Sequence, residues 1–163
     1  MSRARRLLLI SGLALAIIGM GYGLSYAVFT EHQSLDAIGV SLAQGFGAAS
    51  EQNTALADSS MGKYKQAKYV YDRQVDAHGH LIGLAMLLLV LGIGFDRVEF
   101  SERLRFLLAL ALVCGAVLFP LGVYLQTLSH DSLPRAIAIL GSALVIAALA
   151  GTALGVFRAR ASF

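Results

Sequence analysis

Four long apolar stretches limit what this chain can fold into. Residues 7–29 and 136–157 contain no charged side chain, and residues 104–128 contain only Arg105. Residues 77–95 are also uncharged, although two histidines lie near their start. A helix of about 20 mostly apolar residues is long enough to cross the hydrocarbon core of a bilayer. The sequence therefore predicts an all-α integral membrane four-helix bundle.

Composition supports lipid as the solvent of this chain. Of its 163 residues, 57% are hydrophobic and only 14% are charged. A soluble protein of this length cannot bury so much apolar surface in one core. The spans and one mostly polar segment use the whole sequence, which leaves no room for a soluble catalytic module. We expect one membrane domain over residues 1–163, with helices at about 7–29, 77–95, 104–128 and 134–157 and a long outer loop at 30–76.

The distribution of basic residues predicts the orientation. Lysine and arginine are enriched in short loops on the cytoplasmic side of a membrane. The larger set of basic residues lies close to the ends of the spans on one side of the membrane, and a smaller set lies on the other side. The first comprises Arg3, Arg5, Arg6, Arg97, Arg103, Arg105, Arg158 and Arg160, and the second Lys63, Lys65, Lys68, Arg73 and Arg135. We expect a multi-pass inner-membrane protein with both termini cytoplasmic and the loop outside, which is periplasmic in a bacterium.

The partners follow from the same pattern. The net charge of +3 reflects membrane topology, so the expected partner is the lipid bilayer and not a nucleic acid. Gly-x-x-x-Gly steps in the spans let helices approach closely in lipid. They indicate a close-packed bundle, and also a homo-oligomer or a subunit of a larger membrane complex.

All four histidines fall on the outer face under this topology. His32 follows the first span, His78 and His80 begin the second, and His130 follows the third. Histidine is the commonest protein ligand of haem iron, copper and zinc. Residues two positions apart on a helix point in directions about 200° apart around the helix axis. His78 and His80 therefore cannot both point into one site. This spacing favours a single axial ligand over a two-histidine chelate.

Small and aromatic residues complete the candidate site. Gly79 and Gly83 leave a flat patch beside the histidines where a large planar ring could approach. Tyr124 is the candidate catalytic group, because its hydroxyl can reach the outer half of the bundle. The plainer interpretation is that the histidines and tyrosines are interfacial polar groups satisfied by water or headgroups. For His78 and His80 this plainer interpretation is less favoured, because ionisable groups within a membrane span are energetically costly and are usually functional.

The segment Asp-Ala-His-Gly-His-Leu-Ile-Gly at 76–83 resembles two settings. It is similar to the Ala-His-x-Gly opening of the second helix in the styrene oxide isomerase family, and also to histidine-bearing helices of the haem–copper oxidase superfamily. The first resemblance implies a four-helix trimer holding haem b near subunit contacts, with His78 and Gly79 as the matching residues. The family's asparagine further along this helix is absent, since Gly83 and Leu84 occupy that region.

Three functional hypotheses remain open from the sequence. The first is a haem-b-binding membrane protein, acting as an isomerase on a small apolar substrate such as an epoxide or as a redox relay. The second is a non-catalytic accessory subunit of a larger membrane complex. The third is a copper or zinc site at the outer face, built from His32, His78 or His80, and His130.

Overall fold

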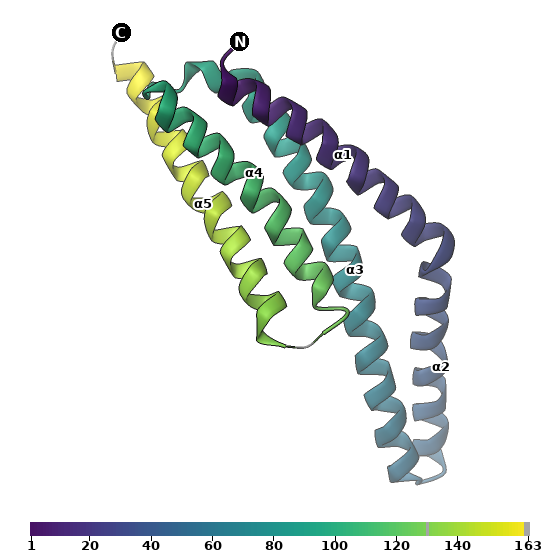
Figure 1. Cartoon of the computed structure of the whole chain (residues 1–163). Coiled ribbons are helices and arrows are strands. Elements are labelled where there is room, and N and C mark those ends of the chain that lie inside the picture. Colours follow the sequence, from purple (N-terminus) through teal and green to yellow (C-terminus); the bar gives the residue numbers. More distant parts are fainter. Residues whose placement is uncertain (130, 162–163) are drawn as a thin grey trace.

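The structure, a computed structural model, describes residues 1–129 and 131–161. This part of the chain is helical, with short connections. The elements are α1 (Arg3–Phe29), α2 (Glu31–Ser50), α3 (Thr54–Gly94), the 3-10 turn η1 (Phe95–Arg97), α4 (Glu102–Leu125) and α5 (Ser132–Ala161) (Figure 1). Four of them, α1, α3, α4 and α5, are long and apolar enough to cross a membrane. The expected four-helix membrane fold is therefore confirmed.

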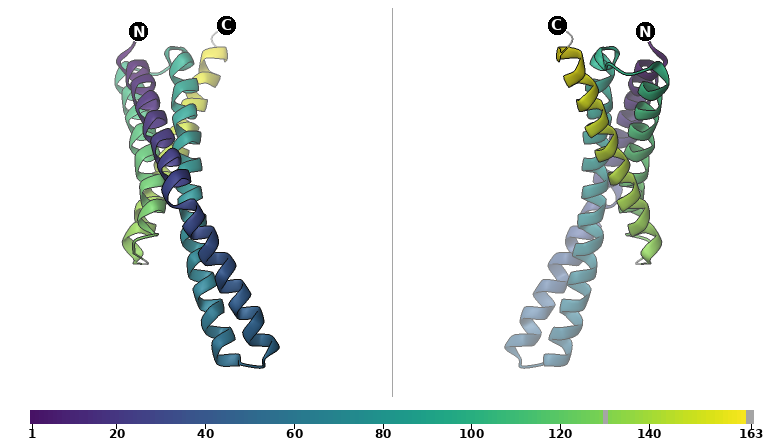
Figure 2. Two further views of the ribbon diagram at one scale, coloured as in Figure 1. Left: turned by 90° about the vertical axis from the view of Figure 1, so that its right-hand side faces the viewer. Right: turned by 90° about the vertical axis from the view of Figure 1, so that its left-hand side faces the viewer.

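Both termini lie at one end of the bundle, together with the connection between α3 and α4 (Figures 1 and 2). At this end an ion pair links α1 to η1, since Arg5 Nη1 lies 3.2 Å from a carboxylate oxygen of Asp96. Side-chain caps begin two of the helices here. Ser2 Oγ accepts from the Arg5 amide, and Ser101 Oγ accepts from the Leu104 amide. Such caps satisfy amides that have no partner inside the helix.

The segment at 30–76, expected as a loop, is instead a helical hairpin. The helix α2 occupies most of its first half, and the second span does not begin at 77, because α3 extends back to Thr54. Gln52 makes the turn with a left-handed φ of 57°. Asn53 then caps α3, since its side-chain oxygen accepts from the Leu56 amide at 3.1 Å.

This hairpin projects beyond the rest of the molecule (Figure 2). The 41 residues of α3 rise about 60 Å at ~1.5 Å per residue, roughly twice the hydrocarbon thickness of a bilayer. Ion pairs one turn apart support its polar half, with Lys68 Nζ at 2.6 Å from Asp72 and Arg73 at 2.9 Å from Asp76. One continuous helix therefore forms both a membrane span and half of the projection.

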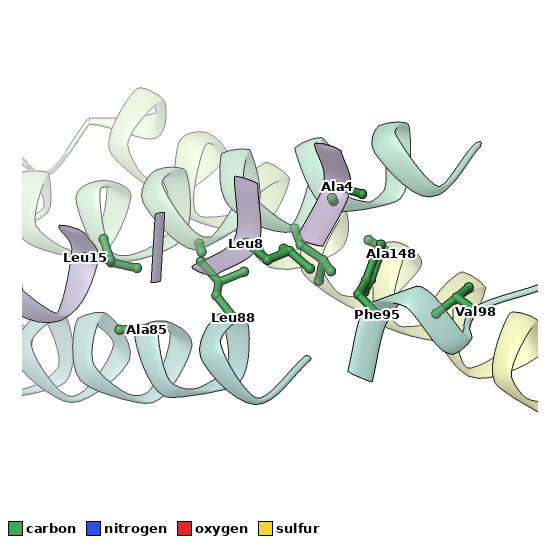
Figure 3. Packing of buried hydrophobic residues seen from close by; sticks show 11 residues of the cluster. Ala4, Leu8, Leu15, Ala85, Leu88, Phe95, Val98 and Ala148 are labelled. Atoms are coloured by element: carbon green, nitrogen blue, oxygen red, sulfur yellow. The ribbon is translucent and has the colours of Figure 1, made fainter. Parts of the chain in front are cut away.

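The main apolar core lies toward the end that carries the termini (Figure 3). Leu8 of α1, Leu88 of α3 and Leu112 of α4 are at most 1% exposed, and Phe95 of η1 joins the same cluster. The outer apolar faces of the same helices remain exposed, as expected for a chain whose solvent is lipid. The core thus packs α1, α3 and α4 together between the level of His78 and the end of the bundle that carries the start of α1.

The helices α4 and α5 approach each other through glycines. An added Cβ at Gly122 would lie 2.4 Å from the Ala138 backbone nitrogen, and one at Gly141 would lie 2.4 Å from the Phe119 nitrogen. The helix α4 continues through the buried Pro120 to Leu125. Small residues permit this close backbone contact. In lipid there is no hydrophobic driving force between helices, so such close packing is what holds α4 and α5 together.

Candidate functional site

His78 lies on the side of α3 that packs against α1, near the outer end of the four-helix part. Its imidazole occupies a notch made by Gly23 of α1. A Cβ added at Gly23 would lie 2.4 Å from His78 Cε1 and 3.0 Å from Nε2. Only glycine at this position therefore leaves room for the ring.

The backbone of α1 also sets the orientation of this ring. His78 Nδ1 lies 3.2 Å from the carbonyl oxygen of Gly19. A carbonyl oxygen only accepts hydrogen bonds, so Nδ1 carries the proton and donates it. In the neutral imidazole the lone pair is then on Nε2, the state required of a metal ligand.

Two polar side chains close to His78 in sequence, Gln74 and Asp76, do not hydrogen-bond to its ring. Asp76 instead pairs with Arg73. The backbone carbonyl of Gln74 accepts a long hydrogen bond of 3.5 Å from the Tyr22 hydroxyl. The Gly19 carbonyl of α1 is therefore the group that orients the His78 ring.

His80 belongs to a different contact. Its ring centroid lies 4.3 Å from that of Phe119 in α4, with the two planes 32° apart. His78 therefore faces α1 and His80 faces α4, as their spacing on one helix predicts. The structure does not bring the two imidazoles together.

Gly79 and Gly83 form an open face of α3. Both are exposed, and an added Cβ would meet no atom within 4 Å at either position. By helical spacing the two glycines lie between the His78 and His80 sides of α3. The flat patch expected from the sequence is thus present, and it faces outward from the bundle.

The other two histidines are His32 and His130. His32 lies exposed on α2, and His130 falls outside the described residues. Among the residues that the structure does describe, no group of three His, Cys, Asp or Glu side chains could hold a metal ion.

An apolar crevice opens between α1 and α4 close to His78. Its volume is about 310 Å³, and Ala77 and Leu81 of α3 contribute to its lining. Tyr22 and Tyr124 meet edge to face beside it, with ring centroids 5.8 Å apart. Tyr22 also lies 6.4 Å from the His78 ring. The rest of the lining is Leu15, Ile18, Val117, Pro120 and Leu121.

The phenol groups give this crevice its polar end. No hydrogen bond of Tyr124 Oη is found within the described part of the chain, and that of Tyr22 is long. Pockets for small molecules are typically apolar with a few placed polar groups, and about 300 Å³ is the lower end of their size range. The crevice suits a small apolar molecule with one hydrogen-bonding oxygen.

Tyr124 was expected in the outer half of the bundle, but its edge-to-face contact with Tyr22 was not predicted. Sequence reasoning also missed Gly19 and Gly23 as the seat of His78, although their Gly-x-x-x-Gly spacing marked a face that another helix approaches. Comparison with protein-family models, with curated proteins and with solved structures finds no match to this chain.

Proposed function

We propose that this protein is a haem-b-binding membrane protein with His78 as the axial ligand. The observation that carries the proposal is the hydrogen bond from Nδ1 to the Gly19 carbonyl, which leaves the Nε2 lone pair available. Ligating histidines almost always make such a bond through their other nitrogen. Among the described residues no such bond of His80 is found, and its ring packs at a tilt against Phe119.

The surroundings of His78 fit a large planar ligand. Gly79 and Gly83 leave the adjacent face of α3 open, and the nearby Val75 and Met86 are 43% and 54% exposed. A macrocycle over this face would be enclosed by lipid or by a second copy of the chain. We therefore propose a homo-oligomer, such as a trimer, with this face at the contact between copies.

Bound haem would supply Lewis-acid or one-electron chemistry at its iron. The chain itself orients the ligand through Gly19, and its crevice admits a small apolar molecule from the bilayer. Tyr22 and Tyr124 would donate hydrogen bonds to an oxygen of that molecule, such as the oxygen of an epoxide. By helical spacing the crevice residues Ala77 and Leu81 lie on the opposite side of α3 from the Gly79 and Gly83 face. Electron relay, which needs no substrate in contact with the iron, therefore fits this arrangement better than isomerisation.

An absorption spectrum of the purified protein tests this proposal. We expect detergent-purified protein supplemented with haem b to show a Soret band that persists after removal of free haem. A protein with no retained Soret band at stoichiometric haem contradicts the proposal.

The projecting hairpin favours one alternative, an accessory subunit of a larger membrane complex. Val40, Phe46 and Leu56 are 54%, 72% and 47% exposed on a part of the chain that extends beyond the bundle. Exposed apolar side chains outside the membrane are typical of protein contact sites. A haem-free protein that remains bound to the same membrane partners through purification would support this function.

We also propose that the termini are cytoplasmic, in an inner membrane, with the hairpin on the outer side. In a Cys114→Ala background, we expect a cysteine at Ser2 to react with an impermeant maleimide only after the cells are permeabilised. A cysteine at Ser50, near the hairpin tip, should react in intact cells. The reverse pattern of labelling would invert the topology.

A further inference from the structure

A second cavity lies at the end of the bundle that carries the start of α1 (Figure 1), away from the level of His78 and His80. It has a volume of about 380 Å³ and lies between the first turns of α1 and α4. Its lining residues are Arg3, Glu102, Arg103 and Phe106. Three charged groups and one aromatic ring thus share a cavity at the proposed cytoplasmic membrane surface.

The two arginines of this cavity are available to a ligand. Both are exposed, and no ion pair joins either of them to an acid among the described residues. The neighbouring arginines differ, because Arg5 pairs with Asp96 and Arg105 donates to the Asp96 carbonyl. Arg3 and Arg103 are therefore the guanidinium groups with unused hydrogen-bonding capacity in this cavity.

The electrostatic field at this end favours an anion. The cavity lies between the N-termini of α1 and α4, which carry partial positive charge, whereas α3 and α5, whose C-termini lie at the same end, do not line it. Arginines outnumber acids among the described residues of this end. The cations are Arg3, Arg5, Arg6, Arg97, Arg103, Arg105 and Arg158, and the acids are Asp96, Glu99 and Glu102.

The apolar side of the cavity indicates where the anion comes from. Phe106 lies four residues into α4, about 6 Å below its start, and is 38% exposed. Further toward the middle of the membrane spans, Leu110 of α4 and Ile10 of α1 are 41% and 56% exposed. A phosphate at the arginines would therefore have an apolar surface beneath it, which suits an acyl chain and not a soluble anion.

From these contacts, we infer that the cavity binds an anionic glycerophospholipid of the inner leaflet. Arg3 and Arg103 hold the phosphate by charge-assisted hydrogen bonds, which guanidinium groups form well. Phe106 lies against the start of an acyl chain. Glu102 accepts hydrogen bonds from headgroup hydroxyls, so phosphatidylglycerol is the lipid that the four side chains complement.

Native mass spectrometry of the delipidated full chain tests this inference. With equimolar phosphatidylglycerol and phosphatidylcholine, we expect the first bound lipid to be phosphatidylglycerol. In the Arg3→Gln/Arg103→Gln variant this preference should fall about tenfold, because the two positive charges that favour net-negative phosphatidylglycerol over zwitterionic phosphatidylcholine are removed. The matched control is Arg97→Gln/Arg158→Gln, which removes the same charge from the same end outside the cavity and should keep the preference.

Each other outcome overturns the inference. Equal loss in both double variants means that the general field attracts the lipid, without a site. Displacement of phosphatidylglycerol by millimolar inorganic phosphate identifies a soluble anion as the ligand. Absence of any preference in the unmutated protein rejects the site whether or not the variants fold.

Discussion

Purified His78→Ala protein should retain no Soret band, whereas His80→Ala protein should keep the band of the unmutated chain. The reason is the state of the two imidazoles. The Gly19 carbonyl leaves Nε2 of His78 with its lone pair, and the ring of His80 packs at a tilt against Phe119. The measurement is a haem titration followed by absorption spectroscopy and a haem-to-protein ratio. Loss of the band in His80→Ala alone would transfer the ligand to His80.

A substitution that leaves both histidines in place provides an independent control of this result. In Gly23→Ala, the new Cβ would lie 2.4 Å from His78 Cε1, so the ring must rotate away from the Gly19 carbonyl. Loss of such a supporting bond typically weakens metal binding about 10-fold to 100-fold. Gly21→Ala is the matched variant, because a Cβ there meets no atom within 4 Å, and its haem affinity should not change.

The largest effect on stability is expected at the contact between α4 and α5. In Gly122→Ala, the added methyl would lie 2.4 Å from the Ala138 backbone nitrogen, which no rotamer change can relieve. Overpacking of this kind costs about 1–3 kcal/mol. Thermal unfolding in detergent, followed by circular dichroism, should show a clearly lower midpoint than for the unmutated protein.

Gly21→Ala serves again as the comparison for this measurement. It makes the same chemical change in the interior of a membrane helix, but its methyl would enter open space. Alanine has the higher helix propensity, so the midpoint should stay the same or rise. Equal destabilisation by both substitutions would show that glycine itself, and not the helix contact, matters.

Hydrophobic length was sufficient to predict the four membrane spans. Uncharged stretches such as 7–29 and 136–157 have few alternatives to a helix in lipid. The divergence of His78 and His80 was equally predictable, because 100° per residue follows from helix geometry. Both predictions depend on local properties of the chain, which a single sequence contains.

The hairpin and the notch at Gly23 were not predictable in the same way. The polar part of α3 has no long apolar stripe, and its helical state depends on packing against α2 and on pairs such as Lys68–Asp72. The packing of the His78 ring depends on how α1 and α3 align, because this alignment places Gly19 and Gly23 opposite the imidazole. Tertiary alignment of this kind leaves no readable pattern in one helix.

The unbroken course of α3 gives the protein a mechanical property. From Thr54 to His78 the helix contains no proline and no interruption, and this distance is about 36 Å at ~1.5 Å per residue. A rod of that length that tilts by about 5° moves its far end by ~3 Å. Because the helix is unbroken between the two positions, a tilt of the hairpin would also displace His78 relative to Gly19 and strain the hydrogen bond between them.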